Sequence, residues 1–233
     1  MTLDIVYEDT DTLVLNKPSG ISVHKTHPQD PHETLIDFVL EKYPEIKSVG
    51  ENPLRPGLVH RLDKETSGLI ILAKNQKTFE YFKNLFQTRQ IKKTYLALVY
   101  GQLKNKKGRI DLALGKIGTK QTTRLVGKKE LTERAAVTDY EVIKEFPTYS
   151  LLQVYPQTGR THQIRIHLKS IGHPIVCDPI YGGKKEVCPP ELGRLFLHAQ
   201  RLEFKDPNGQ NLVLEVDPPK ELTNFLKSSN ITQ

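Results

Sequence analysis

Residues 60–74 read HRLDKETSGLIILAK and join a polar segment to a continuous apolar run. The run predicts a strand that is buried on both faces, because it lacks the polar alternation of a half-exposed strand. The polar segment places the carboxylate of Asp63 between basic neighbours. Loops positioned by a rigid sheet often carry catalytic residues. From the residues alone, two interpretations of Asp63 stay open: a catalytic group, or a turn cap paired with Arg61.

The sequence on either side of this stretch alternates irregularly between predicted strands and a few helices. Short apolar or alternating runs predict strands, and helical spacing of apolar residues predicts helices. The Pro- and Gly-rich stretch 44–57 is predicted to be a loop. In the third helix, Ile164, Leu168 and Ile171 are expected to form the buried stripe. The predicted strands are 5–7, 13–15, 69–74, 92–101, 109–114, 136–146, 149–156 and a hairpin over 202–216, and the predicted helices are 33–43, 76–89, one within 158–172, and 221–227.

This order of elements favours an α+β fold with a mixed, largely antiparallel β-sheet and flanking helices and loops over a doubly wound fold. The chain of 233 residues shows no repeat and no low-complexity linker, so one domain over residues 1–233 is expected.

The formal net charge is +7, and one segment carries all of it. Residues 103–134 hold ten Lys or Arg against three Asp or Glu, while the other 24 basic and 24 acidic residues balance. Such a run is either a solvated face or an arm that binds phosphates and releases their counterions. The candidate phosphate-binding side chains are Lys104, Lys106, Lys107, Lys128 and Lys129.

Several protein classes are disfavoured. No apolar run approaches the roughly 18–20 residues of a membrane helix, and the acidic start does not resemble a signal peptide, so a cytoplasmic protein is expected. No GxGxxG, Walker or HExxH motif is present, so we expect neither a metal nor an organic cofactor. Cys177 and Cys188, with ten residues between them, are expected to be reduced structural thiols.

The segment HRLDKETSG resembles the HRLDxxTSG signature of the RluA-type pseudouridine synthases, which isomerise uridine in RNA. Four further segments resemble family motifs in the same order. They are LNKPSGISVH (15–24), KKTYLALVYG (92–101), TGRTHQIRIHLKSIGHPIVCD (158–178) and RLFLHAQRLEF (194–204). The resemblance covers most of the chain and implies the pseudouridine synthase fold with a central RNA-binding cleft.

The resemblance also implies residue roles. Asp63 would be the nucleophile that breaks the N-glycosidic bond of uridine, Arg165 its guanidinium partner, and Tyr95 the ring against which the base packs. Arg61 and His60 would contact the RNA, with Arg61 filling the space that a flipped nucleotide leaves. Leu197 would form part of the apolar floor under the base. His162 and His167 are too poorly aligned for a joint metal site, and we expect them to form hydrogen bonds within their motif.

Two other functions stay open: a catalytically silent RNA-binding protein on the same scaffold, and a nucleoside or glycoside hydrolase, which would need a second carboxylate or a metal. The first predicted strand begins within about five residues of Met1, so the S4-type RNA-binding domain of larger relatives is expected to be absent. The expected partner is ribosomal or transfer RNA, and a monomer is expected.

Overall fold

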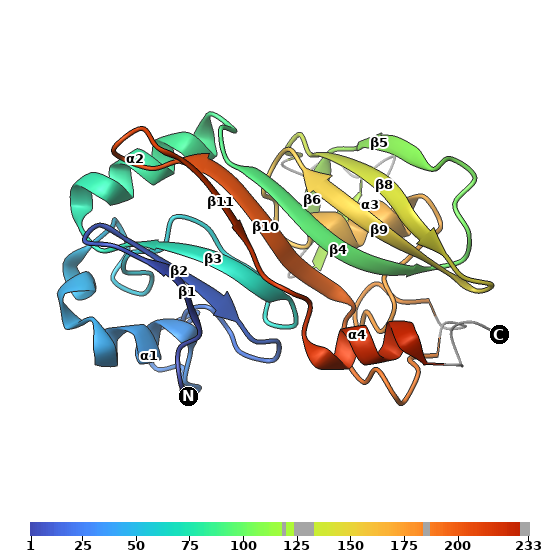
Figure 1. Ribbon diagram of the computed structural model, residues 1–233, viewed down its shortest axis with the longest axis horizontal. Helices are drawn as coiled ribbons and strands as arrows, with labels where there is room; N and C mark the ends of the chain where they lie inside the picture. Colours follow the sequence, from blue (N-terminus) through green and yellow to red (C-terminus); the bar gives the residue numbers. More distant parts are fainter. Residues whose placement is uncertain (118–119, 124–132, 184–186, 229–233) are drawn as a thin grey trace. The chain divides into compact units, whose positions relative to one another are not determined.

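The computed structural model describes residues 1–117, 120–123, 133–183 and 187–228, and these residues form two compact units (Figure 1). The first unit contains residues 1–93 and 199–217, and the second contains residues 94–198 and the chain from Pro218 onward. The chain passes between the units within strand β4 (Lys92–Tyr100) and again within strand β10 (Leu197–Lys205). The single domain expected over residues 1–233 stays a prediction.

The first unit is built on a sheet in the order β1-β2-β3-β10, with β11 added to β10. Pairing is antiparallel between β1 and β2, between β2 and β3, and between β10 and β11. Every residue of β3 is buried, which confirms the strand predicted from the apolar run. The elements are β1 (Ile5–Glu8), β2 (Thr12–Lys17), α1 (Leu35–Lys42), β3 (Ser67–Ala73), α2 (Gln76–Gln87) and β11 (Asn211–Glu215), together with the β10 residues from Ala199.

Local sequence signals explain where the two helices of this unit begin. The side chain of Asp37 accepts a hydrogen bond from the backbone N–H of Thr34 at 2.8 Å, as in a capping box. The side chain of Asn75 accepts from the backbone N–H of Thr78 at 2.9 Å and caps α2. The predicted loop 44–57 was only partly correct, because Pro44–Ser48 form a 3-10 helix with the proline in its first turn.

The second unit contains an antiparallel sheet in the order β4-β9-β8-β5 around an apolar core. The single strand predicted over residues 109–114 was wrong: β5 ends at Asp111, and Leu114 begins a separate two-stranded sheet of β6 and β7. The elements are β5 (Lys107–Asp111), β6 (Leu114–Ile117), β7 (Lys120–Thr123), β8 (Val137–Glu145), β9 (Tyr149–Pro156), α3 (Gln163–Ser170) and α4 (Lys220–Lys227).

Helix α3 is buried on all sides, from Gln163 to Leu168. The predicted stripe is confirmed for Ile164 and Leu168, but Ile171 is 38% exposed, because the helix ends at Ser170 and Ile171 is its C-cap. Polar residues between the predicted apolar positions are buried as well, among them Arg165 and His167. A helix that is buried all round needs hydrogen-bond partners for such residues.

Antiparallel strands with flanking helices confirm the predicted α+β class. No helix in the described part of the chain is both long and apolar enough to cross a membrane.

Candidate functional site

The Asp63 loop lies in the first unit, directly before β3. Leu62 is buried and anchors the loop, Arg61 before it is exposed, and Asp63 is partly exposed. The backbone turns after Asp63, since the N–H of Thr66 donates to the carbonyl of Asp63 at 3.1 Å. A partly exposed carboxylate on an anchored turn can reach a bound substrate.

The end of β2 and the residues after it also hold this loop in place through hydrogen bonds. Lys17 is fully buried, and its Nζ donates to the carbonyl of Lys64 at 3.1 Å. The hydroxyl of Ser19 donates to the carbonyl of Glu65 at 2.7 Å, and the N–H of Gly20 donates to the carbonyl of Lys64 at 2.9 Å. The LNKPSG segment therefore holds the backbone that follows Asp63.

Gly68 explains why the loop ends in a glycine. Its φ of +114° is disfavoured for any residue with a side chain, and an added Cβ would lie 2.2 Å from the carbonyl oxygen of Ala199 in β10. The end of the HRLDKETSG motif and the Leu-His-Ala motif thus meet backbone to backbone within the first unit.

His60 has internal partners. Its Nε2 accepts the N–H of Ile71 at 2.9 Å, and its ring stacks on Phe86 with centroids 4.6 Å apart. Burial, with a smaller effect from the charge of Lys93, lowers the pKa of His60 to about 3, so the ring is neutral at physiological pH. The structure therefore gives His60 a packing role, and its predicted contact with RNA stays a prediction.

Arg165, on α3 of the second unit, forms a buried bidentate pair with Asp178. Its Nε lies 2.8 Å from Oδ2 and its Nη2 lies 2.7 Å from Oδ1 of Asp178. Oδ1 also accepts the backbone N–H groups of Ile180 and Tyr181, both at 2.9 Å. Burial by itself would raise the pKa of Asp178, but the hydrogen bonds and charge of Arg165 outweigh it and hold that pKa below its usual range.

Tyr181 and His162 complete this cluster. The guanidinium carbon of Arg165 lies 5.2 Å from the ring centroid of Tyr181, a cation–π distance. The hydroxyl of Tyr181 lies 2.9 Å from Nδ1 of His162, the residue before α3. The rings of His162 and Tyr181 also meet edge to face, with centroids 5.5 Å apart.

Gln163 and His167 of the TGRTHQIRIH segment also have hydrogen-bond partners inside the second unit. Gln163 accepts from the hydroxyl of Thr158 at 2.6 Å and donates to the hydroxyl of Thr138 at 2.9 Å. His167 contacts that same Thr138 hydroxyl at 2.8 Å and the carbonyl of Leu112 at 3.0 Å. His162 and His167 thus form hydrogen bonds, as predicted, but the prediction that these bonds stay within the motif was wrong, because Tyr181, Thr138 and Leu112 lie outside residues 158–178.

Tyr95 lies on β4, opposite Val154 of β9, and is partly buried against the core of the second unit. Leu197, at the start of β10, belongs to that same apolar core. Contact of either residue with a uracil base stays a prediction.

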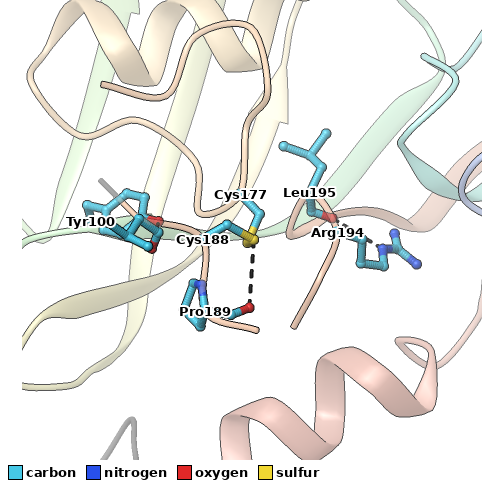
Figure 2. Close-up of a disulfide and its surroundings, with 7 residues drawn as sticks. Tyr100, Cys177, Cys188, Pro189, Arg194 and Leu195 are labelled. Atoms are coloured by element: carbon cyan, nitrogen blue, oxygen red, sulfur yellow. Dashed lines mark hydrogen bonds between the residues drawn. A yellow bond between two sulfur atoms is a disulfide. The ribbon is translucent and has the colours of Figure 1, made fainter. Parts of the chain in front are cut away.

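The two cysteines differ from expectation, because Cys177 and Cys188 form a disulfide (Figure 2). Cys177 has a φ of +58°, and the chain returns so that the two Cα atoms lie 4.6 Å apart, within the range for a disulfide. The hydroxyl of Tyr100 donates to the carbonyl of Val187 at 3.0 Å and fastens the second end of this loop. The reduced thiols predicted from the sequence were wrong, since spacing does not reveal a left-handed backbone turn.

The basic segment is partly compensated where the structure describes it. Lys106 pairs with Glu145, and Lys107 lies 2.8 Å from Glu141. Lys104 is exposed. Lys128 and Lys129, also predicted to bind phosphates, lie outside the described residues.

The structure thus divides the predicted catalytic residues between the units, with Asp63 in the first and Tyr95 and Arg165 in the second. Asp178, which sequence reasoning missed as a partner of Arg165, ends the 158–178 segment that had been singled out. Among the described residues, no three His, Cys, Asp or Glu side chains gather as they would around a metal ion.

Comparisons with known proteins point to one family. Residues 11–170 match the profile of RNA pseudouridylate synthases. The uncharacterized RNA pseudouridine synthase YlyB of Bacillus subtilis is 34% identical over 229 residues, which cover 98% of this chain and 73% of that protein. Ribosomal large subunit pseudouridine synthase D of Borreliella burgdorferi is 34% identical, over 97% of this chain and 70% of its own length. The solved structure of human RNA pseudouridylate synthase domain containing 4 has a TM-score of 0.76 at 26% identity, covering 96% of this chain and 92% of that one.

Proposed function

Because the chain belongs to the RluA-type RNA pseudouridine synthases and is therefore an RNA-modifying isomerase, we propose that Asp63 is the nucleophile of its reaction. The observation that carries this proposal is the Asp63 loop. Its carboxylate is partly exposed, while the backbone after it is held by Lys17, Ser19 and Gly20. A nucleophile needs both access to substrate and a fixed position.

The proposed reaction is an isomerisation that needs no co-substrate. The bond between N1 of uracil and C1′ of ribose breaks with the participation of Asp63, and the base turns. C5 then bonds to C1′, the proton on C5 leaves, and N1 gains a proton, so that atoms and charges balance. We propose that no metal or organic cofactor takes part. An assay with a chelator should therefore keep the full rate.

Arg165 and Tyr95 have proposed supporting roles. The guanidinium of Arg165 would be the partner of the Asp63 carboxylate during the reaction. Tyr95 would offer its ring face to the uracil, where stacking contributes about 1–3 kcal/mol and still allows rotation in the plane. Tyr95→Phe should therefore slow turnover less than Tyr95→Ala.

The substrate is proposed to be a uridine in structured RNA that leaves its stack before reaction. A stacked nucleotide hides its glycosidic bond, and flipping it costs a few kcal/mol. Arg61, exposed beside Asp63, would fill the vacated space, and Leu197 would lie under the base. Several relatives are named for the large ribosomal subunit, so its RNA is the first substrate to test, before transfer RNA. We propose a monomer that acts in the cytoplasm.

Tritium release from RNA labelled at C5 of uridine tests the function directly. The wild type should release C5 tritium and leave the RNA chain intact. Asp63→Asn should bind the same RNA with unchanged affinity and release none. A silent RNA-binding protein would release no tritium in either form, and a hydrolase would leave free uracil or an abasic site. Tritium release by Asp63→Asn at the wild-type rate would remove Asp63 from the mechanism.

The basic segment is proposed to bind RNA phosphates. Replacing Lys104, Lys106, Lys107, Lys128 and Lys129 by Gln should weaken RNA binding and flatten its dependence on salt, because fewer counterions are released. Lys47 and Lys77, exposed lysines of the first unit, serve as matched controls. An unchanged salt slope in the fivefold variant would mean that the segment is only a solvated face.

A further inference from the structure

The second unit contains a carboxylate cluster whose geometry sets the direction of a guanidinium. Asp178 binds Arg165 through Nε and Nη2, at 2.8 and 2.7 Å. A guanidinium is planar and its donors are fixed relative to one another. A bidentate pair on the Nε and Nη2 edge therefore also fixes where the Nη1 donors point.

Asp178 is itself held in place. Its Oδ1 accepts the backbone N–H groups of Ile180 and Tyr181, and its carbonyl accepts the N–H of Gly182 at 3.0 Å. Both side chains of the Arg165–Asp178 pair are almost completely buried, with 2% and 0% exposed. The carboxylate therefore has little freedom to rotate, and neither has the guanidinium bound to it.

Tyr181 restrains the guanidinium from its face. The ring packs over Arg165 at 5.2 Å, and its hydroxyl is held by His162 at 2.9 Å. His162 directly precedes α3, the helix that carries Arg165. The contacts therefore run from Arg165 to the turn 178–181 and back to the residue before the same helix.

We propose that Asp178, Tyr181 and His162 are positioning residues for Arg165, and that they fix the direction in which its Nη1 donors point. This inference rests on the proposed function, in which Arg165 serves the Asp63 carboxylate. In this proposal the two carboxylates have different roles: Asp178 fixes the orientation of the guanidinium, and Asp63 performs the chemistry. A positioning role predicts that turnover changes while RNA affinity does not.

Steady-state tritium release with saturating C5-labelled RNA tests the inference. Asp178→Asn keeps the shape of the side chain but places an amide donor against Arg165, so kcat should fall about 100-fold, the effect of a displacement of about 1 Å. The KM and the RNA Kd should stay within about twofold of the wild type. Asp139→Asn is the matched control, because Asp139 pairs with Arg109 in a similar bidentate way but on the surface. It should leave kcat unchanged.

A second set of variants avoids the buried pair. His162 has a φ of +56°, which both Gly and Asn adopt readily. His162→Gly removes the contact to the Tyr181 hydroxyl and should lower kcat several-fold, whereas His162→Asn restores a polar partner and should recover most of the rate. Tyr181→Phe keeps the ring over Arg165 and should resemble His162→Gly.

The outcomes separate the two proposals. If Asp63→Asn is inactive but Asp178→Asn turns over at the wild-type rate, or loses only RNA affinity, the positioning inference is overturned and the proposed function stands. If the wild type releases no tritium, the proposed function itself fails. Should Asp178→Asn not fold, His162→Gly and Tyr181→Phe decide: wild-type kcat in both overturns the inference, and a several-fold loss with recovery in His162→Asn supports it.

Discussion

Two Arg–Asp pairs in the second unit share their chemistry and their geometry and differ in their surroundings. Arg109 binds Asp139 through Nε at 2.7 Å and Nη2 at 3.0 Å, much as Arg165 binds Asp178. The side chains of the first pair are 63% and 27% exposed, and those of the second are 2% and 0% exposed.

The difference shows that burial, more than contact geometry, decides what an ion pair does. Water screens an exposed pair, so such pairs contribute about 0–1 kcal/mol. A buried pair gains little net stability over apolar residues, yet breaking it leaves a charge without water or partner. The Arg109–Asp139 pair therefore contributes little to stability. The Arg165–Asp178 pair is suited to holding one orientation.

The largest predicted effect is on the buried arginine. Arg165→Met should lower the free energy of unfolding by about 3–5 kcal/mol, because Asp178 would be left buried and uncompensated. Arg109→Met should lower it far less, because water screens the exposed pair. Urea unfolding followed by circular dichroism measures both. The double variant Arg165→Met/Asp178→Leu should regain much of the stability without regaining activity. Equal losses in the two single variants would contradict the comparison.

The disulfide beside Asp178 gives the next largest effect. Closing a loop of this length stabilises by about 3 kcal/mol, so Cys177→Ser, or reduction of the wild type by a dithiol, should cost about that much. Cys177→Gly should cost about 1 kcal/mol less, because glycine adopts the φ of +58° without strain. Thermal melts with and without reductant measure these losses. A Cys177→Ser protein as stable as the oxidised wild type would mean that the link does not support this region.

Burial lowers the pKa of His60 without a compensating opposite charge. This predicts that the free energy of unfolding depends on pH. Its pKa in the folded chain is about 3, below the unfolded value of about 6.5, so the unfolded state binds the extra proton. Stability is thus complete above about pH 6.5 and is lost as the pH falls toward 3, by about 2 kcal/mol between pH 7.5 and 5. Urea unfolding across this range should show the slope.

His60→Gln is the control for this titration, because Gln can still accept the N–H of Ile71 but does not titrate. Its slope between pH 7.5 and 5 should be smaller by nearly the whole effect. The pKa values of His24 and His167 are also lowered by burial and add slope of the same sign. The lowered pKa of Asp178 affects stability only at lower pH. The stabilisation from the ionised carboxylate is present above the unfolded pKa of about 4 and is lost as the pH falls through the pKa of the folded state.

The smallest predicted effect concerns the exposed pair of Lys107 and Glu141, which face each other across β5 and β8 at 2.8 Å. A double-mutant cycle with Lys107→Gln and Glu141→Gln should give a small coupling energy that disappears in about 1 M salt. A coupling of several kcal/mol that resists salt would show that this surface behaves like the buried pair.

Sequence reasoning succeeded where the pattern is local. The apolar run after Gly68 predicted β3, and the spacing of apolar residues predicted the helices, because periodicity reports burial within one element. It failed at Ile171, because the helix ends one residue earlier, at Ser170. It also failed at residues 109–114, where the single predicted strand is two strands. Such boundaries depend on capping and on strand partners far away in the chain.

The same distinction between local pattern and distant contact applies to the candidate site. The sequence alone determined the family, through five ordered motifs, and drew attention to Asp63, Tyr95 and Arg165. Only the tertiary structure decided that Arg165 is held by Asp178, that His60 packs on Phe86, and that Cys177 bonds Cys188. The physical reason is that a motif records which chemical groups are present, whereas partners, burial and therefore charge state arise only when distant segments fold against one another.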